Sequence, residues 1–353
     1  VQVVEGTGGH RWLRGGRRAG REVACGAVVA CVTCAMFVTC RDVPRGAVTW
    51  GPCRARRLVH EPFPRRPPAA RAPPLSSRAM PYRGRLAPTP TGDMHVGHAR
   101  TYMVAFTRAR AAGGTLALRI EDLDPLRCRR EWAERAMEDL AWLGITWDGE
   151  VTWQSARRDT YLAAWRRLRD AGLVYPSTVS RRELRDAAHA PHEDEEEAEP
   201  LFPAALRPPP GTGRDVASPA GTTWRFRVPD GTTIAFTDAL QGERRYVAGV
   251  DIGDFVVWRR DDVPAYELAV VADDVAMGIT EVVRGADLLR STARQLLLHA
   301  ALGATPPAWC HVPLVRDAAG RRLAKRDDAL SIRTLRARGL SPGEVLSMAD
   351  ASV

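Results

Sequence analysis

The sequence predicts an α/β fold in which a parallel sheet is covered by crossover helices. From Met80 onward, short apolar runs alternate with amphipathic stretches of helical length. This alternation stops after residue 175, where an acidic run and a Pro/Gly-rich stretch follow, and strand-like patterns return at residue 224. The 353 residues are enough for one to three domains with a sizeable core.

The first half of the predicted sheet lies in residues 80–175. Short apolar runs predict strands at residues 86–87 and 116–120. Helical periodicity follows each of them, and a third amphipathic helix comes later, so that helices are predicted at residues 101–112, 132–143 and 161–171.

An insertion is predicted at residues 176–230, irregular or partly disordered between 176 and 220 because of its proline, glycine and acidic content. The rest of the insertion and the second half of the sheet are predicted at residues 231–315. A loop with a short helical tail is predicted at residues 316–353. Strands are predicted at residues 224–228, 232–236, 255–259, 267–271, 279–284 and 311–315, and a helix at 292–302.

Residues 1–79 differ in composition from the rest of the chain. They hold five of the seven cysteines and a net charge of +10, whereas the remainder carries −1. Their apolar stretch at residues 23–40 is similar to a signal peptide or marginal membrane segment, and the Cys31/Cys34 pair alone is a weak indication of zinc. We expect Met80 to be the natural start and residues 1–79 to be disordered or not native.

The charge distribution argues against a global electrostatic attraction to nucleic acid, because the part after Met80 is nearly neutral. Contacts with RNA would come from local arginine clusters, each of which is more often a solvated helix face. The candidates are Arg157 with Arg158, Arg166 with Arg167 and Arg169, and Arg181 with Arg182. Only Cys128 and Cys310 remain after Met80, which favours a reducing cytoplasm. No membrane association is expected, and a monomer is the default.

Two motifs far apart in the sequence suggest phosphate chemistry. Lys325 is the only lysine among 51 basic residues, and its compact charge is one that arginine does not reproduce. Upstream, His95 and His98 flank Gly97 after a Pro-Thr-Gly turn, where a predicted helix begins. A helix N-terminus attracts anions, and imidazoles there can donate hydrogen bonds to a phosphate. Taken singly, the two histidines could instead be a metal-binding pair or ordinary surface residues. The single lysine could have been retained by chance.

These motifs carry a family resemblance. His95-Val96-Gly97-His98 resembles the HIGH signature of class I aminoacyl-tRNA synthetases, and the segment at residues 322–326, Arg-Leu-Ala-Lys-Arg, resembles a degenerate KMSKS loop. Further segments at residues 118–124, 264–274 and 283–289 resemble the glutamyl branch, and the similarity covers roughly residues 82–338. It is greatest to the glutamyl-queuosine tRNA(Asp) synthetases, which lack an anticodon-binding domain.

The resemblance implies a Rossmann-like catalytic domain with an inserted acceptor-stem-binding region. Because only residues 330–353 follow the lysine loop, no anticodon-binding domain is expected. The implied activity is ATP-dependent activation of L-glutamate, with Mg²⁺ and without tRNA, followed by transfer to queuosine at the wobble position of tRNA(Asp).

The resemblance also implies the residues of the site. ATP would be held by His95, Gly97, His98 and Lys325, of which the two histidines and the lysine are catalytic. The glutamate site would comprise Arg85, Leu86, Ala87, Pro88, Thr89, Glu121, Tyr266 and Arg284. Glu121 would pair with the α-amino group and Arg284 with the side-chain carboxylate. From the residues alone, Glu121 could instead pair with Arg119 or Arg127, and Tyr266 could be an ordinary strand aromatic.

Relatives of this branch often carry a structural zinc ion. At the ligand positions this sequence has Ser177, Val179, Phe202 and Leu206, which are not zinc ligands. His189 and His192 are nearby but beside an acidic run, so we expect no structural zinc.

Two other functions remain open from the sequence. One is a catalytic core of a glutamyl-tRNA synthetase that charges a tRNA 3′ end. The other is a non-catalytic RNA-binding relative, which the altered segment at residues 322–326 favours and the retained His95, His98, Glu121 and Lys325 oppose.

Overall fold

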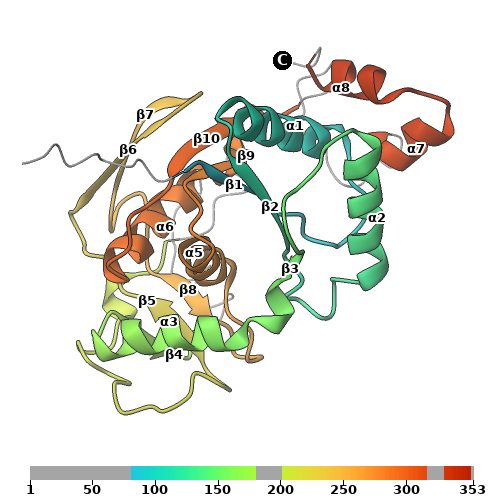
Figure 1. Cartoon of the computed structure of the whole chain (residues 1–353). Helices are drawn as coiled ribbons and strands as arrows, with labels where there is room; N and C mark the ends of the chain where they lie inside the picture. Colours follow the sequence, from blue (N-terminus) through green and yellow to red (C-terminus); the bar gives the residue numbers. More distant parts are fainter. Residues whose placement is uncertain (1–80, 180–200, 316–329, 351–353) are drawn as a thin grey trace, which may run out of the picture. The chain divides into compact units, whose positions relative to one another are not determined.

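The computed structural model describes residues 81–179, 201–315 and 330–350 (Figure 1), all within the compact unit Pro74–Val353. The predictions for residues 1–79, for the Lys325 loop, for Arg181 and Arg182, and for the acidic run with His189 and His192 lie outside the described residues.

The first half of the sheet is parallel. Strands β1 (Arg83–Leu86), β2 (Thr115–Ile120) and β3 (Thr152–Trp153) pair in that order. Helix α1 (Val96–Ala111) crosses from β1 to β2, and α2 (Arg130–Trp142) crosses from β2 to β3. The buried positions of α1 are Val96, Ala99, Tyr102, Ala105 and Ala109, a spacing of three and four residues that packs one helix face against the sheet.

The second half adds strands beside β1. Strands β9 (Glu281–Gly285) and β10 (Ala308–Val312) pair in parallel and are joined by α6 (Leu289–Ala301). Strand β10 also pairs in parallel with β6 (Thr233–Asp238), which forms an antiparallel hairpin with β7 (Gly242–Val247). The amide of Thr280 donates to the carbonyl of Arg83 at 2.8 Å, so β9 lies next to β1 (Figure 1). The carboxyl ends of β1 and β9 are therefore neighbours.

The inserted region has a core of its own. Strands β4 (Val174–Ser177), β5 (Thr223–Phe226) and β8 (Phe255–Trp258) form an antiparallel sheet. Trp165 from α3 (Arg158–Asp170), together with Trp224 and Trp258, is buried there against α5 (Tyr266–Ala276). Described residues 201–220 hold only a 3-10 turn at Ala204–Leu206 and irregular turns.

The structure corrects several element predictions. The strand predicted at residues 267–271 is wrong, since this segment lies in α5, where Glu267 through Asp274 are all buried. Because eight consecutive positions of α5 are buried, its central apolar run shows no helical period and resembles a buried strand. The last strand lies at Ala308–Val312 instead of 311–315, and α1 begins at Val96, five residues before the predicted start. Strands β4 and β7 were not predicted; β7 is polar and largely exposed.

The chain after residue 329 forms two short helices, α7 (Ile332–Ala337) and α8 (Pro342–Asp350). Ile332, Leu335 and Val345 join the core that contains α1. Among the described residues, no helix combines the length and apolar character needed to cross a membrane.

Candidate active site

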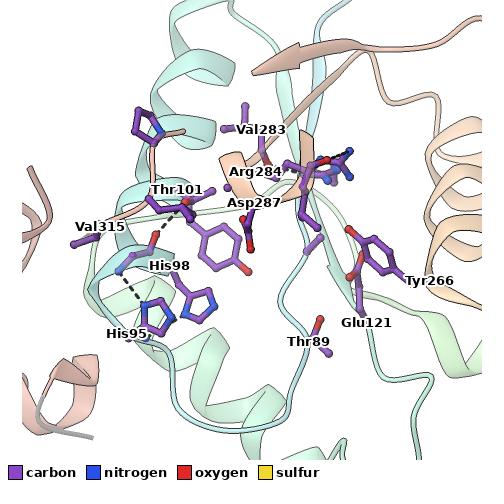
Figure 2. A pocket seen from close by; sticks show the side chains of 18 residues that line it. Thr89, His95, His98, Thr101, Glu121, Tyr266, Val283, Arg284, Asp287 and Val315 are labelled. Atoms are coloured by element: carbon purple, nitrogen blue, oxygen red, sulfur yellow. Dashed lines mark hydrogen bonds between the residues drawn. The ribbon is translucent and has the colours of Figure 1, made fainter. Parts of the chain in front are cut away.

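A cavity of about 420 Å³ opens at the carboxyl ends of β1 and β9 and at the start of α1. This is where ligands bind in open parallel sheets, and the volume suits a small molecule. Figure 2 shows the imidazoles of His95 and His98 on one side of the cavity and Glu121 and Tyr266 on the other. The two sides are chemically different.

The histidine side is organised by the start of α1. His95 is the N-cap, and its Nδ1 accepts a hydrogen bond from the amide of Gly97 at 3.1 Å. His98 Nδ1 accepts from the amide of His95 at 3.2 Å, which completes a reciprocal capping box. Because Nδ1 is an acceptor in both rings, each neutral imidazole carries its proton on Nε2. Two N–H donors and a helix N-terminus thus meet at one side of the cavity.

Gly97 is required at this helix start by the histidine beside it. A Cβ at this position would lie 2.9 Å from Cε1 and 3.0 Å from Nδ1 of the His95 ring. The His95 ring occupies the space in which a Gly97 side chain would lie. The missing side chain therefore makes room for the capping imidazole.

The opposite side contains buried charges of both signs. Arg119, fully buried, contacts Glu121 at 3.0 Å and Asp274 at 2.6 Å. Arg85 donates to the carbonyl of Val283 at 2.9 Å and lies 3.7 Å from Asp274. Burial raises the pKa of Glu121 despite the guanidinium groups of Arg119 and Arg85. A bound ammonium group would favour its ionised form.

The guanidinium of Arg284 donates hydrogen bonds to two uncharged side chains. Its Nε donates to Nε2 of His311 at 3.1 Å, and its Nη2 donates to the hydroxyl of Thr292 at 2.7 Å. The guanidinium lies over the ring of Trp309, 5.1 Å from its centroid. It is 5% exposed and lines the cavity. Such a cation can bind a carboxylate.

The cavity brings together most of the predicted site residues. Its lining includes Arg85, Ala87, Thr89, His95, Gly97, His98, Glu121, Tyr266 and Arg284. Leu86 is an exception, because its side chain is fully buried in the core. Pro88 lines a smaller neighbouring pocket, and its carbonyl accepts from the amide of Glu121.

Other lining residues were missed by the sequence analysis. They are Thr101, Tyr102, Val283, Gly285, Asp287, Leu288, Pro313, Leu314 and Val315. Asp287 could have been suspected, since it follows β9 in a segment already compared with the family. Thr101 and Tyr102 follow one helical turn after His98, so the helical period alone would have placed them on the cavity side.

Comparison with known proteins identifies the family. The catalytic domain of class I tRNA synthetases (E and Q) matches residues 82–349. The chain belongs to the class I aminoacyl-tRNA synthetases. It is similar to the Glutamyl-Q tRNA(Asp) synthetase of Nitratidesulfovibrio vulgaris, with 45% identity over 74% of this chain and 83% of the relative. That of Symbiobacterium thermophilum is also 45% identical, over 74% of this chain and 84% of the relative.

A solved synthetase of this class has the same fold. The glutamate tRNA ligase from Elizabethkingia meningosepticum, in complex with its amino acid, matches with a TM-score of 0.59 and 29% identity. The match covers 70% of this chain and 52% of that protein, so the chain spans about half the length of this solved ligase. The Rossmann-like catalytic fold is the shared part.

An apolar cluster lies at the positions where the family resemblance implied zinc ligands. Phe202 and Tyr175 are buried against each other, with Val179 packed beside them and Leu206 exposed. The guanidinium of Arg225 lies 4.4 Å from the centroid of the Phe202 ring. Among the described residues, no group of three or more histidine, cysteine, aspartate or glutamate side chains could hold a metal ion.

Several arginines that were suggested for RNA contacts are paired within the protein. Arg157 contacts Asp273 at 2.6 Å, and Arg158 contacts Asp262 at 2.6 Å. Arg169 contacts Asp170 and donates to the carbonyl of Val216. The sequence shows clusters of arginine, but it does not show which carboxylates the fold places beside them.

Proposed function

We propose that this synthetase activates L-glutamate with ATP and then transfers the glutamyl group to queuosine at the wobble position of tRNA(Asp). The observation that carries the proposal is the single cavity in which two imidazole donors face a set of buried charges suited to glutamate. The similarity to two Glutamyl-Q tRNA(Asp) synthetases supports the choice of acceptor.

The histidine side suits the phosphates of ATP. The Nε2–H groups of His95 and His98 provide donors for a phosphate and for charge that develops during transfer, and the positive end of the α1 dipole favours an anion there. Such chemistry depends mainly on positioning and charge neutralisation. Mg²⁺ would accompany ATP and be bound largely through its phosphates, where it supplies positive charge.

Lys325 lies outside the described residues, but the described residues on either side of its segment lie at this site. Val315 lines the cavity, and Ser331 forms a β-bridge with His95. This supports its proposed role as the cation that contacts the leaving phosphates.

The opposite side suits glutamate. Glu121 offers a carboxylate for the α-ammonium group, while Arg284 offers a cation for the side-chain carboxylate. The α-carboxylate would then be directed toward the histidines, where its oxygen attacks the α-phosphorus of ATP and pyrophosphate leaves. In the second step a hydroxyl of the acceptor attacks the carbonyl carbon, and AMP leaves.

The proposal is tested by transfer of labelled glutamate, with ATP, to two tRNA pools, one containing queuosine and one lacking it. We expect label only in the pool that contains queuosine. A third sample, queuosine-containing tRNA trimmed of its 3′-terminal nucleotide, should still be labelled.

The other outcomes identify the alternatives. Equal labelling of both pools, lost on trimming, would indicate charging of a 3′ end. No labelling together with no glutamate-dependent exchange between ATP and pyrophosphate would indicate a non-catalytic relative. A monomeric state, a cytoplasmic location and the absence of structural zinc remain predictions.

A further inference from the structure

We infer that Asp238 and His311 are positioning residues that hold Arg284 in the orientation that selects the side-chain carboxylate of the amino-acid substrate. This inference rests on the proposed function, in which Arg284 binds that carboxylate. Asp238 and His311 are absent from the lining of the cavity and would act only through Arg284.

The three side chains form a continuous buried chain. Asp238 Oδ2 contacts His311 Nδ1 at 2.6 Å, and His311 Nε2 accepts from Arg284 Nε at 3.1 Å. Asp238 is 2% exposed, His311 is fully buried, and Arg284 is 5% exposed. Strands β6, β10 and β9 contribute one residue each, so sheet pairing fixes the spacing of the chain.

The hydrogen bonds determine the tautomer of His311. Asp238 also accepts from the amides of Leu240, Gln241 and His311. Burial would raise the pKa of its carboxyl, but the hydrogen bond from the His311 ring, together with these amide bonds, holds the pKa below the usual range. An ionised carboxylate only accepts, so Nδ1 of His311 carries the proton and Nε2 is the acceptor. Burial and then the charge of Arg284 lower the pKa of His311 to about 4 against the opposing effect of Asp238, which keeps the ring neutral.

The chain orients the guanidinium of Arg284. Its Nε is bound to His311, and its Nη2 is bound to Thr292 and to the carbonyl of Leu288. Nη1 has no hydrogen-bond acceptor in the part of the chain that the structure describes. A fixed guanidinium loses less rotamer freedom on binding and presents its charge in one place. A carboxylate gains a charge-assisted hydrogen bond there, whereas the neutral amide of glutamine gains a weaker one.

The two histidine substitutions separate positioning from folding. His311→Gln can place an acceptor oxygen near the former Nε2 and so retain the bond from Arg284. His311→Asn has a shorter side chain that reaches only the Asp238 end. Asp238→Asn retains an oxygen that accepts from the turn amides, but its NH2 group can donate to Nδ1 of His311. This favours the His311 tautomer that carries its proton on Nε2, so that Nε2–H faces the N–H of Arg284.

The experiment is glutamate-dependent exchange between ATP and pyrophosphate, with KM measured separately for glutamate and ATP. We expect H311N and D238N to raise KM for glutamate about tenfold or more and to lose selectivity against glutamine. KM for ATP should stay within about twofold, and H311Q should stay within about threefold of the parent protein in all parameters.

The outcomes separate this inference from the proposed function. An absence of exchange in the parent protein contradicts the proposed function before any variant is compared. With exchange present, an unchanged KM for glutamate in folded H311N or D238N overturns the inference. Equal impairment of H311Q and H311N, or loss of folding in both H311N and D238N, would also overturn it, because the pair would then serve the fold alone.

Discussion

His95 and His98 each take part in the cap of α1 and also line the cavity. In His95 and His98, Nδ1 closes the start of α1, and this bond leaves Nε2 as the donor toward the cavity. One ring therefore stabilises a helix and presents a proton to a ligand. Substitutions that replace only one of the two nitrogens distinguish these contributions.

His98→Asn is such a substitution. The amide oxygen of asparagine can accept from the amide of His95 in place of Nδ1, but nothing replaces Nε2–H. We expect the rate of ATP–pyrophosphate exchange to fall by about 10²–10³, the usual effect of losing one donor to developing charge, with little change in Tm. His98→Ala should lose stability as well, since the cap is removed. A full rate in H98N would show that Nε2 does not act on the phosphates.

At the scale of elements, an apolar cluster occupies the positions at which the family resemblance implied zinc ligands. Tyr175 and Phe202 are buried together, and Val179 packs against them. Beside the cluster, Asp254 accepts hydrogen bonds from the hydroxyl of Tyr175 at 2.6 Å and from Arg207 at 2.8 Å. We expect this packing, and not a metal ion, to stabilise the region.

The apolar cluster leads to two predictions, one for the removal of metal and one for shortening the Phe202 side chain. A chelator should leave Tm unchanged, and elemental analysis should find less than one equivalent of zinc. Phe202→Ala should lower the free energy of unfolding by about 3 kcal/mol, because Phe202 is 4% exposed. Leu201→Ala is the matched control: Leu201 is 37% exposed and should cost about 0.5 kcal/mol or less. A fall in Tm on chelation would contradict the prediction.

At the scale of the whole described unit, buried ion pairs join the two main cores. Arg119 on β2 contacts Asp274 on α5, and β2 and α5 belong to different apolar cores. The neighbouring Asp273 accepts from Gln154, Tyr161 and Arg157. The pairs of Asp274 with Arg85 and Arg119 hold α5, which carries Tyr266, against β1 and against β2, which Glu121 follows.

Asp274→Asn should be strongly destabilising. It removes a carboxylate that faces two buried guanidinium groups, and breaking such a pair costs about 3–5 kcal/mol. Asp262→Asn is the control, since its pair with Arg158 is exposed and asparagine also tolerates the positive φ of 65° there. Denaturant unfolding should show a loss of at most about 1 kcal/mol for D262N. Equal losses in the two variants would contradict this account.

Two buried histidines predict that stability falls with acidification. Burial lowers the pKa of His299, and that of His311 falls to about 4. Above pH 6.5 both histidines are neutral in the folded and in the unfolded chain, so their titration does not change the free energy of unfolding. Between about pH 6.5 and 4 the unfolded chain binds protons that the folded protein does not, and the free energy of unfolding falls, by up to about 3 kcal/mol for His311.

Denaturant unfolding at several pH values measures this dependence. Both ring nitrogens of His299 are buried without a hydrogen-bond partner among the described residues, and the residue lies away from the cavity. His299→Leu should therefore reduce the slope between pH 6.5 and 4 while activity at pH 7.5 is unchanged. A slope equal to that of the parent protein would show that His299 does not contribute.

The sequence by itself determined the family, the α/β class and half of the residues that line the cavity. Motifs such as His95-Val96-Gly97-His98 are contiguous, and the period of amphipathic helices is local, so both can be read along the chain. The same local reading was wrong for α5, because its buried positions run consecutively from Glu267 to Asp274 and so show no helical period.

Only the tertiary structure decided which distant groups meet. The chain from Asp238 through His311 to Arg284 joins three strands, and the ion pairs of Asp273 and Asp274 join two cores. The packing of Phe202 against Tyr175 likewise joins residues that are distant in the sequence. Pairing of strands far apart in sequence and burial of opposite charges are properties of the assembled sheet. The spacing of residues along the chain does not encode them.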